Sequence, residues 1–155
     1  MYQCCIKFLK SIPIPICGLI LAIISLGNLL FSQGYILLGI IYDCIGLVLM
    51  LLVVLKVLFT LNHCVKSLKD PIIGSVSPTF TMSLMVISSF LNRAFPNQKG
   101  IYFLWWFAVF LHFVLVIYFI FSHILPKPIT IADVYPSWFI TFVGIGVISN
   151  TSPSF

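Results

Sequence analysis

The sequence contains no glutamate, and only 7% of its 155 residues are charged. Its three acidic residues are aspartates in three separate segments, which gives no pair of neighbouring carboxylates for acid–base catalysis. The sequence also lacks a nucleophile-elbow pattern and a glycine-rich loop of the kind that binds phosphate. We therefore predict that the protein is not an enzyme, and nothing in the sequence points to a cofactor.

Cysteine and basic residues are present, but neither forms the pattern of a known kind of site. The five cysteines are an odd number with two inside apolar runs, which is not typical of a disulfide framework. No Cys-X-X-Cys pair occurs with a histidine motif, so we expect no metal site. The net charge is +5, but the Lys and Arg residues are scattered singly between apolar runs, which argues against a nucleic-acid partner.

Hydrophobic residues make up 61% of the sequence, and the mean hydropathy is +1.21. Because about half apolar is usual for a globular chain, the excess must face lipid. Unpaired backbone groups are too costly in lipid, so each long apolar run should be a helix. We therefore predict an all-α integral membrane protein, a single transmembrane domain over residues 1–155 in the cell membrane, with the lipid bilayer as a partner.

Five apolar runs predict about five transmembrane helices, since a bilayer core about 30 Å thick needs roughly 20 apolar residues of helix. The predicted helices cover residues 13–32, 35–59, 78–91, 101–125 and 136–148. Residues 60–76 are polar and rich in helix breakers, which predicts a loop. Because the fifth helix has no following span to pair with, we expect the chain to be truncated.

The distribution of basic residues predicts the orientation in the membrane. With the N-terminus inside, five lysines fall in cytoplasmic segments, whereas only Arg93 and Lys99 fall in outside segments. Cytoplasmic loops carry the excess of Lys and Arg, so this difference favours a cytoplasmic N-terminus. Lys56, near the inner end of the second helix, is expected to extend to the same side.

The first, third and fifth predicted helices (the odd helices) differ in composition from the fourth, which is rich in bulky aromatics, lacks glycine and suits contact with lipid. At 100° per residue, small and hydroxyl residues fall on one face of each odd helix. These residues are Gly18, Ala22 and Ser25 on the first, Ser77, Thr81 and Ser88 on the third, and Ser137, Thr141 and Gly144 on the fifth. Such a stripe indicates either close helix packing or the wall of a polar path, and both interpretations stay open.

A proline opens each odd helix, and the three prolines lie about sixty residues apart: Pro15, Pro78 and Pro136. Proline suits the first turn of a helix, where its missing N–H has no partner to lose. The spacing predicts helical-hairpin repeats, which are a known plan for membrane transport proteins.

Few ionisable residues lie inside the predicted helices. Asp43 falls within the second helix, where a carboxylate is costly and often serves as an ion or proton site. We favour the alternative, in which Asp43 reaches outward or pairs with a basic residue elsewhere. His112 and His123 are eleven residues apart, about 16 Å along a helix, so one metal ion cannot bind both. We expect His112 to be a hydrogen-bonded packing residue.

Three short motifs lie at the heads of the odd helices, in order along the chain. They are Ile12–Leu19 followed by Leu26-Gly27-Asn28, Asp70-Pro71 through Pro78-Thr79-Phe80, and Tyr135-Pro136-Ser137-Trp138-Phe139 leading to Val143-Gly144-Ile145. Together they resemble the tellurite-resistance and dicarboxylate transporter (TDT) family, which includes TehA-like proteins and the slow-type anion channels. The resemblance implies half of a ten-helix protomer, with odd helices around a central pore, even helices outside them, and protomers assembled as trimers.

The same resemblance implies membrane transport of anions, either C4-dicarboxylates such as malate or small inorganic anions. We therefore predict a truncated anion transporter or channel in which the nine stripe residues line the pore. The family's gating phenylalanine belongs to a ninth helix, so no gate residue is assigned. The expected partners are small anions and either two further copies in a homotrimer or the missing C-terminal half. The alternative is a non-transporting membrane scaffold or assembly subunit.

Overall fold

The computed structural model describes residues 11–96, 98–126 and 134–152, and within these ranges every regular element is a helix. The elements are α2 (Ile16–Ser32), α3 (Ile36–Phe59), α4 (Leu61–Ser67), α5 (Pro71–Val76), α6 (Thr79–Ala94), α7 (Lys99–Phe119), η1 (Ile120–Ile124) and α8 (Trp138–Thr151). The all-α class predicted from hydropathy is confirmed.

Three helical segments are long and apolar enough to cross a membrane: Ile36–Phe59, Pro71–Ala94 and Lys99–Ile124. The shorter apolar helices α2 and α8 have 17 and 14 residues. At about 1.5 Å per residue, α2 spans roughly 25 Å, close to the thickness of the hydrocarbon core. These five segments correspond to the predicted membrane helices.

The segment 60–76 is largely helical, although hydropathy predicts a loop there. Asp70 caps the N-terminus of α5, because its carboxylate accepts hydrogen bonds from the backbone N–H groups of Ile72 and Ile73, at 2.9 and 3.3 Å. Pro71 follows at the first helical position, where proline costs no hydrogen bond. The third span therefore begins at Pro71 and bends at Ser77 and Pro78, between α5 and α6.

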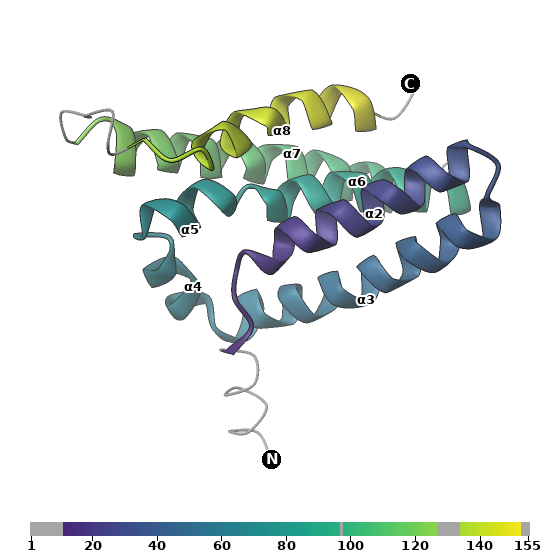
Figure 1. The fold of residues 1–155 in the computed structure, drawn as a ribbon, viewed down its shortest axis with the longest axis horizontal. Helices are drawn as coiled ribbons and strands as arrows, with labels where there is room; N and C mark the ends of the chain where they lie inside the picture. The colour runs from purple at the N-terminus through teal and green to yellow at the C-terminus, as the bar shows by residue number, and fades with distance from the viewer. Residues whose placement is uncertain (1–10, 97, 127–133, 153–155) are drawn as a thin grey trace, which may run out of the picture.

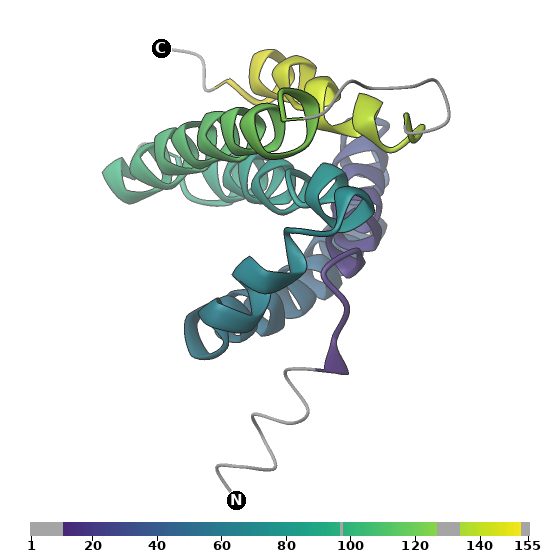
Figure 2. The same ribbon diagram turned by 90° about the vertical axis from the view of Figure 1, so that its left-hand side faces the viewer.

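Helix α6 lies in the centre of the bundle, with the α2–α3 hairpin on one side and α7 and α8 on the other (Figure 1). The view along the bundle shows the same order, with α6 between the two pairs (Figure 2). Of the apolar window in each long span, 72% is buried for the span that contains α6, but only 28% and 33% for α3 and α7. The least hydrophobic of the three long spans is therefore the inner one, and the two more hydrophobic spans face outward.

The α2–α3 hairpin is closed by glycines. Its turn uses Gly34 at φ 91°, a conformation that favours glycine. A Cβ at Gly27, Gly39 or Gly46 would overlap atoms of the opposite helix, so these three residues set the closest approach of α2 and α3. The remaining buried residues of α3 continue this stripe at helical spacing, and most of the other side chains of α3 are exposed or half-buried.

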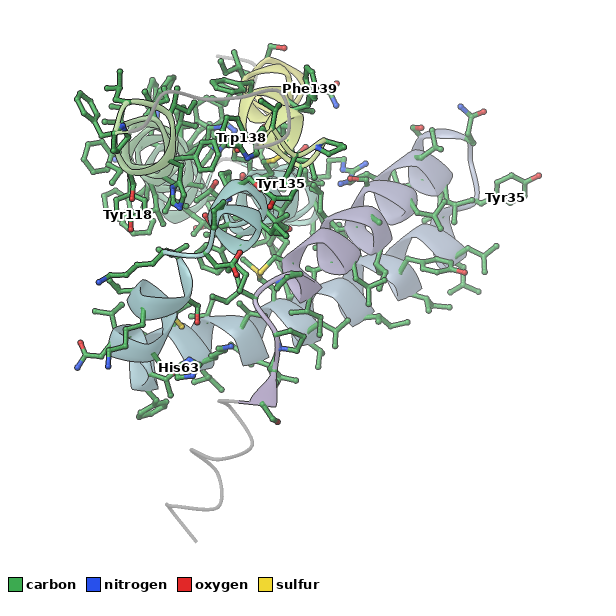
Figure 3. All side chains as sticks on the ribbon, turned by 60° about the vertical axis from the view of Figure 1, so that its left-hand side comes forward. Tyr35, His63, Tyr118, Tyr135, Trp138 and Phe139 are labelled. Atoms are coloured by element: carbon green, nitrogen blue, oxygen red, sulfur yellow. The ribbon has the colours of Figure 1, made fainter. Side chains whose placement is uncertain are left out.

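The bundle has two ends that later sections refer to by name. Figure 3 shows Tyr35 at the tip of the α2–α3 hairpin (the turn end) and His63 on α4 at the opposite end (the α4 end). Lys56 lies near the α4 end with 3% of its surface exposed, and its Nζ donates to the carbonyl oxygen of Ile12. Lys56 thus lies at the end of the bundle that the sequence predicts to face the cytoplasm, but its ammonium group finds its partner inside the protein, at the start of α2.

Candidate functional site

The hydroxyl groups around α6 first satisfy carbonyl oxygens of their own chain segment. Ser77 Oγ donates to Gly74 O at 2.8 Å, Thr81 Oγ1 to Pro78 O at 2.7 Å, and Ser88 Oγ to Met85 O at 2.7 Å. Each hydroxyl has one proton, so these bonds leave only its oxygen lone pairs for a neighbour. The stripe of α6 therefore offers acceptors to the neighbouring helices.

His112 of α7 uses one of these acceptors in the middle of the bundle. The side chain is fully buried, and its Nδ1 lies 2.9 Å from Thr81 Oγ1. Because the Thr81 proton is directed at Pro78 O, the geometry assigns the proton of this contact to His112 Nδ1. Among the described residues the Nε2 atom has no hydrogen-bond partner; it faces Gly144, where a Cβ would overlap the ring. His112 thus joins α6, α7 and α8, the packing role expected from the sequence.

A second polar contact joins α5 to the start of α8 at the α4 end. Ser75 Oγ donates to Ser137 Oγ at 2.7 Å, and Thr141 Oγ1 donates to the Ser75 carbonyl oxygen at 3.0 Å. The sequence analysis missed Ser75, because the residue lies in the segment predicted to be a loop. The Asp70-Pro71 capping signal would have extended the third helix far enough to include it.

Aromatic side chains pack beside this contact. Trp138, at the start of α8, lies against the α7 side of the bundle (Figure 3), with its ring centroid 5.4 Å from that of Phe119 in an edge-to-face arrangement. His123 of η1 stacks on the Phe119 ring, with the two ring centroids 5.1 Å apart. Edge-to-face and stacked pairs at such distances stabilise the junction of α7 and α8.

A third polar contact lies at the turn end. Trp105 Nε1 donates to Thr151 Oγ1 at 3.1 Å, and Thr151 Oγ1 donates to Val147 O at 2.7 Å. A cavity of about 190 Å³ lies next to this contact and is lined by residues of α6, α7 and α8, including Ser88 and Arg93.

The nine residues predicted to line a pore fall into two groups. Thr81, Ser88, Ser137, Thr141 and Gly144 lie at or beside the three polar contacts just described, and Ser77 is buried at the bend between α5 and α6.

The first helix contributes the second group, which lies apart. Ala22 and Ser25 are exposed, Gly18 is half-buried, and no atom lies within 4 Å of a Cβ built at Gly18. These three residues line the side of α2 that faces neither α3 nor α6. The odd-helix stripes thus serve helix packing on α6 and α8 and form an open surface on α2, and a pore-lining role stays a prediction for all nine.

Asp43 is buried in the α2–α3 hairpin with 1% of its surface exposed, against Gly27. Neither of its carboxylate oxygens has a hydrogen-bond partner among the described residues. Arg93 of α6 is the basic residue that acts electrostatically on Asp43, but its guanidinium lies over the Phe31 ring, 4.7 Å from the centroid. In the described part of the chain, no group of three or more His, Cys, Asp or Glu side chains is placed to hold a metal ion.

Comparison with known proteins gives one finding for this chain. The model of a protein family described as voltage-dependent anion channel (SLAC1) matches residues 11–155. No curated protein and no solved structure gives a significant match. The matched region contains all the helices described above and all nine residues of the odd-helix stripes.

Proposed function

Because the chain belongs to the voltage-dependent anion channel (SLAC1/TDT) family of multi-pass membrane proteins, we propose that it forms one side of an anion path along the face of α2 that is turned away from α3 and α6. The family consists of anion channels and transporters and not of enzymes. The proposal assigns the wall of the path to the face of α2 that carries Gly18, Ala22 and Ser25.

The observation that carries this proposal is the difference in burial between the membrane spans. The span with α6 is 72% buried, while α3 and α7 present most of their apolar side chains outward. Helices α3 and α7 have hydrophobic outer faces that suit contact with acyl chains. Helices α2, α6 and α8 therefore remain as the inner layer. On α2, the exposed surface carries Gly18, Ala22 and Ser25 alongside exposed leucines such as Leu26 and Leu29, and the three small residues leave room for an ion.

Weak binding is the chemical property that this wall would supply. A conducting path must let an ion leave as readily as it enters. The described residues of α2 and α8 include no Lys or Arg, and Arg93 in the last turn is the only basic residue of α6. We infer that the transported species are small inorganic anions or C4-dicarboxylates such as malate, held by neutral groups along most of the path.

Further helices would complete the path on the open side of α2. We infer that these come either from two further copies of the chain in a homotrimer or from the remaining helices of the family's ten-helix protomer. The experiment below uses the chain alone, so that its own contribution is measured first.

Anion flux in proteoliposomes tests the proposed function. We expect vesicles with the purified chain to release chloride or labelled malate faster than protein-free vesicles of the same lipid. A ten-helix family member, reconstituted identically, serves as the positive control. Flux from that control but none from this chain would contradict transport by the chain alone and would favour the alternative of a non-transporting scaffold or assembly subunit.

Cysteine accessibility tests where the path runs. In a chain whose native cysteines are replaced, we expect Ala22→Cys and Ser25→Cys to react with a charged, membrane-impermeant thiol reagent. Val48→Cys on the exposed side of α3 should stay unreactive, because charged reagents do not enter the hydrocarbon. Thr81→Cys should also stay unreactive, since position 81 is buried against His112. Unreactive cysteines at both 22 and 25 would remove α2 from the path.

A further inference from the structure

An apolar pocket lies at the α4 end of the bundle, where α4 sits beside the end of α3 (Figure 1). Its volume is about 280 Å³, and its walls come from α2, α3, α4, α6 and α7. A cavity of about 150 Å³ lined by aliphatic and aromatic side chains already holds benzene. The pocket therefore has room for a larger apolar group. Aliphatic side chains dominate the lining, among them Val57 of α3, Leu61 and Val65 of α4, and Leu111 and Leu115 of α7.

The polar side chains that line this pocket already have partners within the protein. Lys56 Nζ donates to the carbonyl oxygen of Ile12, so the lysine contributes its aliphatic stem to the wall. Ser77 Oγ donates to Gly74 O at 2.8 Å. The lining cysteines behave as small hydrophobic side chains. A buried water needs two to four polar partners, which this lining does not supply, so an apolar occupant fits the pocket better than water.

The pocket opens at the outer surface of the bundle. Leu61 and Val65 both line the pocket and have 56% and 48% of their surface exposed. Helix α4 follows α3 directly after Thr60, so this opening lies where a long membrane span ends. The end of a span lies near the boundary between hydrocarbon and headgroups. The apolar matter next to the opening is therefore the acyl chains of the bilayer.

The charges next to the pocket favour a lipid with an anionic headgroup. Lys66 and Lys69 are exposed, and in the sequence they directly follow the lining residues Val65 and Leu68. Asp70, which caps α5, offsets only one of these two positive charges. Lysines near a membrane surface attract anionic lipids, which are enriched in the cytoplasmic leaflet, and the α4 end is the end predicted to face the cytoplasm.

We propose that the pocket takes up one acyl chain of an anionic phospholipid, with the headgroup outside the pocket on the side of Lys66 and Lys69. The bound chain joins α4 to the ends of α2 and α3 and to α7. The pocket lies among α2, α3 and α6, whereas the proposed anion path follows the face of α2 turned away from α3 and α6. The inference therefore goes beyond the proposed function and does not depend on it: the lipid is bound and not transported.

Photo-crosslinking tests the site without changing a residue. Phosphatidylglycerol with a diazirine near the end of one acyl chain is included as a minor lipid in proteoliposomes of the full chain. Cys17 lines the pocket with 1% of its surface exposed, so a lipid chain reaches it only through the pocket. Ile24, on the same helix and equally buried, does not line the pocket and is the control.

We expect mass spectrometry of the digested protein to find the lipid adduct at Cys17 and not at Ile24. Absence of an adduct at Cys17 would overturn the proposal in favour of a protein segment as the occupant. Equal adducts at Cys17 and Ile24 would also overturn it, because they would show that lipid reaches the interior without this pocket.

Two neighbouring substitutions on α3 test whether the pocket is the route to Cys17. Val57 lines the pocket and is half-buried, whereas Leu58 has 69% of its surface exposed and does not line the pocket. We expect Val57→Phe to fill part of the pocket and to lower the yield of the Cys17 adduct severalfold. Leu58→Phe should leave the yield unchanged. Circular dichroism shows whether both variants keep their helix content, and equal yields for Val57→Phe and the parent would overturn the proposal.

The headgroup is tested with the same diazirine chain on phosphatidylcholine, which carries no net charge. We expect the Cys17 adduct to form in severalfold higher yield from phosphatidylglycerol. Replacing Lys66 and Lys69 together by Gln should remove that difference. Equal yields from the two lipids in the parent chain would overturn the assignment to an anionic lipid, and a difference that persists without the two lysines would overturn their role.

Discussion

His112 occupies space that only a glycine at position 144 leaves free. A Cβ at Gly144 would overlap the imidazole ring, which is fully buried and hydrogen-bonded to Thr81, so the ring has no room to move away. We expect Gly144→Ala to destabilise the protein by about 1–3 kcal/mol, the usual cost of overpacking a closely packed interior. The measurement is the thermal unfolding midpoint in detergent, followed by loss of the monodisperse peak on size-exclusion chromatography.

Gly146→Ala is the matched control for this substitution. Position 146 lies on the same helix, and no atom lies within 4 Å of a Cβ built there. We expect Gly146→Ala to leave the midpoint unchanged or to raise it slightly, because alanine has the higher helix propensity. Equal unfolding midpoints for the two variants would show that His112 does not pack against Gly144 in the folded protein.

Thr81 accepts the Nδ1 proton of His112, and removing that acceptor leaves a buried donor without a partner. We expect Thr81→Val to lower the free energy of unfolding by about 1–3 kcal/mol, the cost of an unmade buried hydrogen bond. Thr81→Ser keeps the hydroxyl and should cost less. The comparison is a pair of unfolding curves under the same detergent conditions, and equal stability of the Val and Ser variants would contradict the assigned hydrogen bond.

Helical periodicity alone indicated that Thr81 and Gly144 share the faces on which small residues gather, but not which neighbour each face meets. The partner of both residues is His112, an isolated histidine on the aromatic-rich α7, whose partners no local pattern identifies. The faces of α6 and α8 were therefore predictable, and the contact between them was not, because it depends on how three helices pack.

Among the elements, α2 and α3 pair through glycines that the stripe of Gly18, Ala22 and Ser25 does not include. Gly46 receives the side chain of Ile24, and a Cβ there would overlap Ile24 Cγ1. The sequence analysis selected the small and hydroxyl residues on the other side of α2, because composition alone does not show which small residues contact a neighbouring helix.

Substitution of Gly46 tests this glycine-mediated pairing. We expect Gly46→Ala to lower the unfolding midpoint through a cost of about 1–3 kcal/mol, because α2 and α3 must separate. Adding Ile24→Ala should restore part of the loss, since the shorter side chain frees the space. Gly100→Ala, where a Cβ meets no atom within 4 Å, is the control. A double variant no more stable than the sum of the single losses would contradict the contact.

The bend between α5 and α6 shows what a hydropathy pattern misses. Residues 71–76 contain proline, glycine and serine, which lower the expected helix content, but α5 is capped by Asp70 and bound to α8 through Ser75. Tertiary contacts of this kind override local propensity. The start of the third helix at residue 78, predicted from hydropathy, was therefore too late by about two turns.

At the scale of the whole molecule, the separation of inner and outer helices could be predicted, because the two kinds of helix differ in amino-acid composition. Aromatic and aliphatic side chains on α3 and α7 are exposed in the bundle, with Leu37 at 74% and Phe103 at 75%. The hydroxyl-rich α6 is the buried helix of the bundle. Which end of the bundle faces the cytoplasm is a separate question, because the helices pack equally well in either direction.

Basic residues differ between the two ends of the bundle and predict its direction in the membrane. The described part of the α4 end carries Lys56 near the end of α3 and Lys66 and Lys69 in or just after α4. The turn end carries Arg93 and Lys99. The larger number of lysines at the α4 end favours a cytoplasmic α4 end.

Labelling of single cysteines in intact cells measures the direction. In the chain with its native cysteines replaced, Gln33→Cys lies in the turn between α2 and α3, and Asn62→Cys lies on α4; both positions are exposed. We expect an impermeant thiol reagent to label position 33 in intact cells and position 62 only after the membrane is permeabilised, because lysines are retained on the cytoplasmic side. The reverse pattern would contradict a cytoplasmic N-terminus. Labelling of both positions in intact cells would show a mixture of orientations, and replacing Lys66 and Lys69 by Gln should increase that mixture if these two charges set the direction.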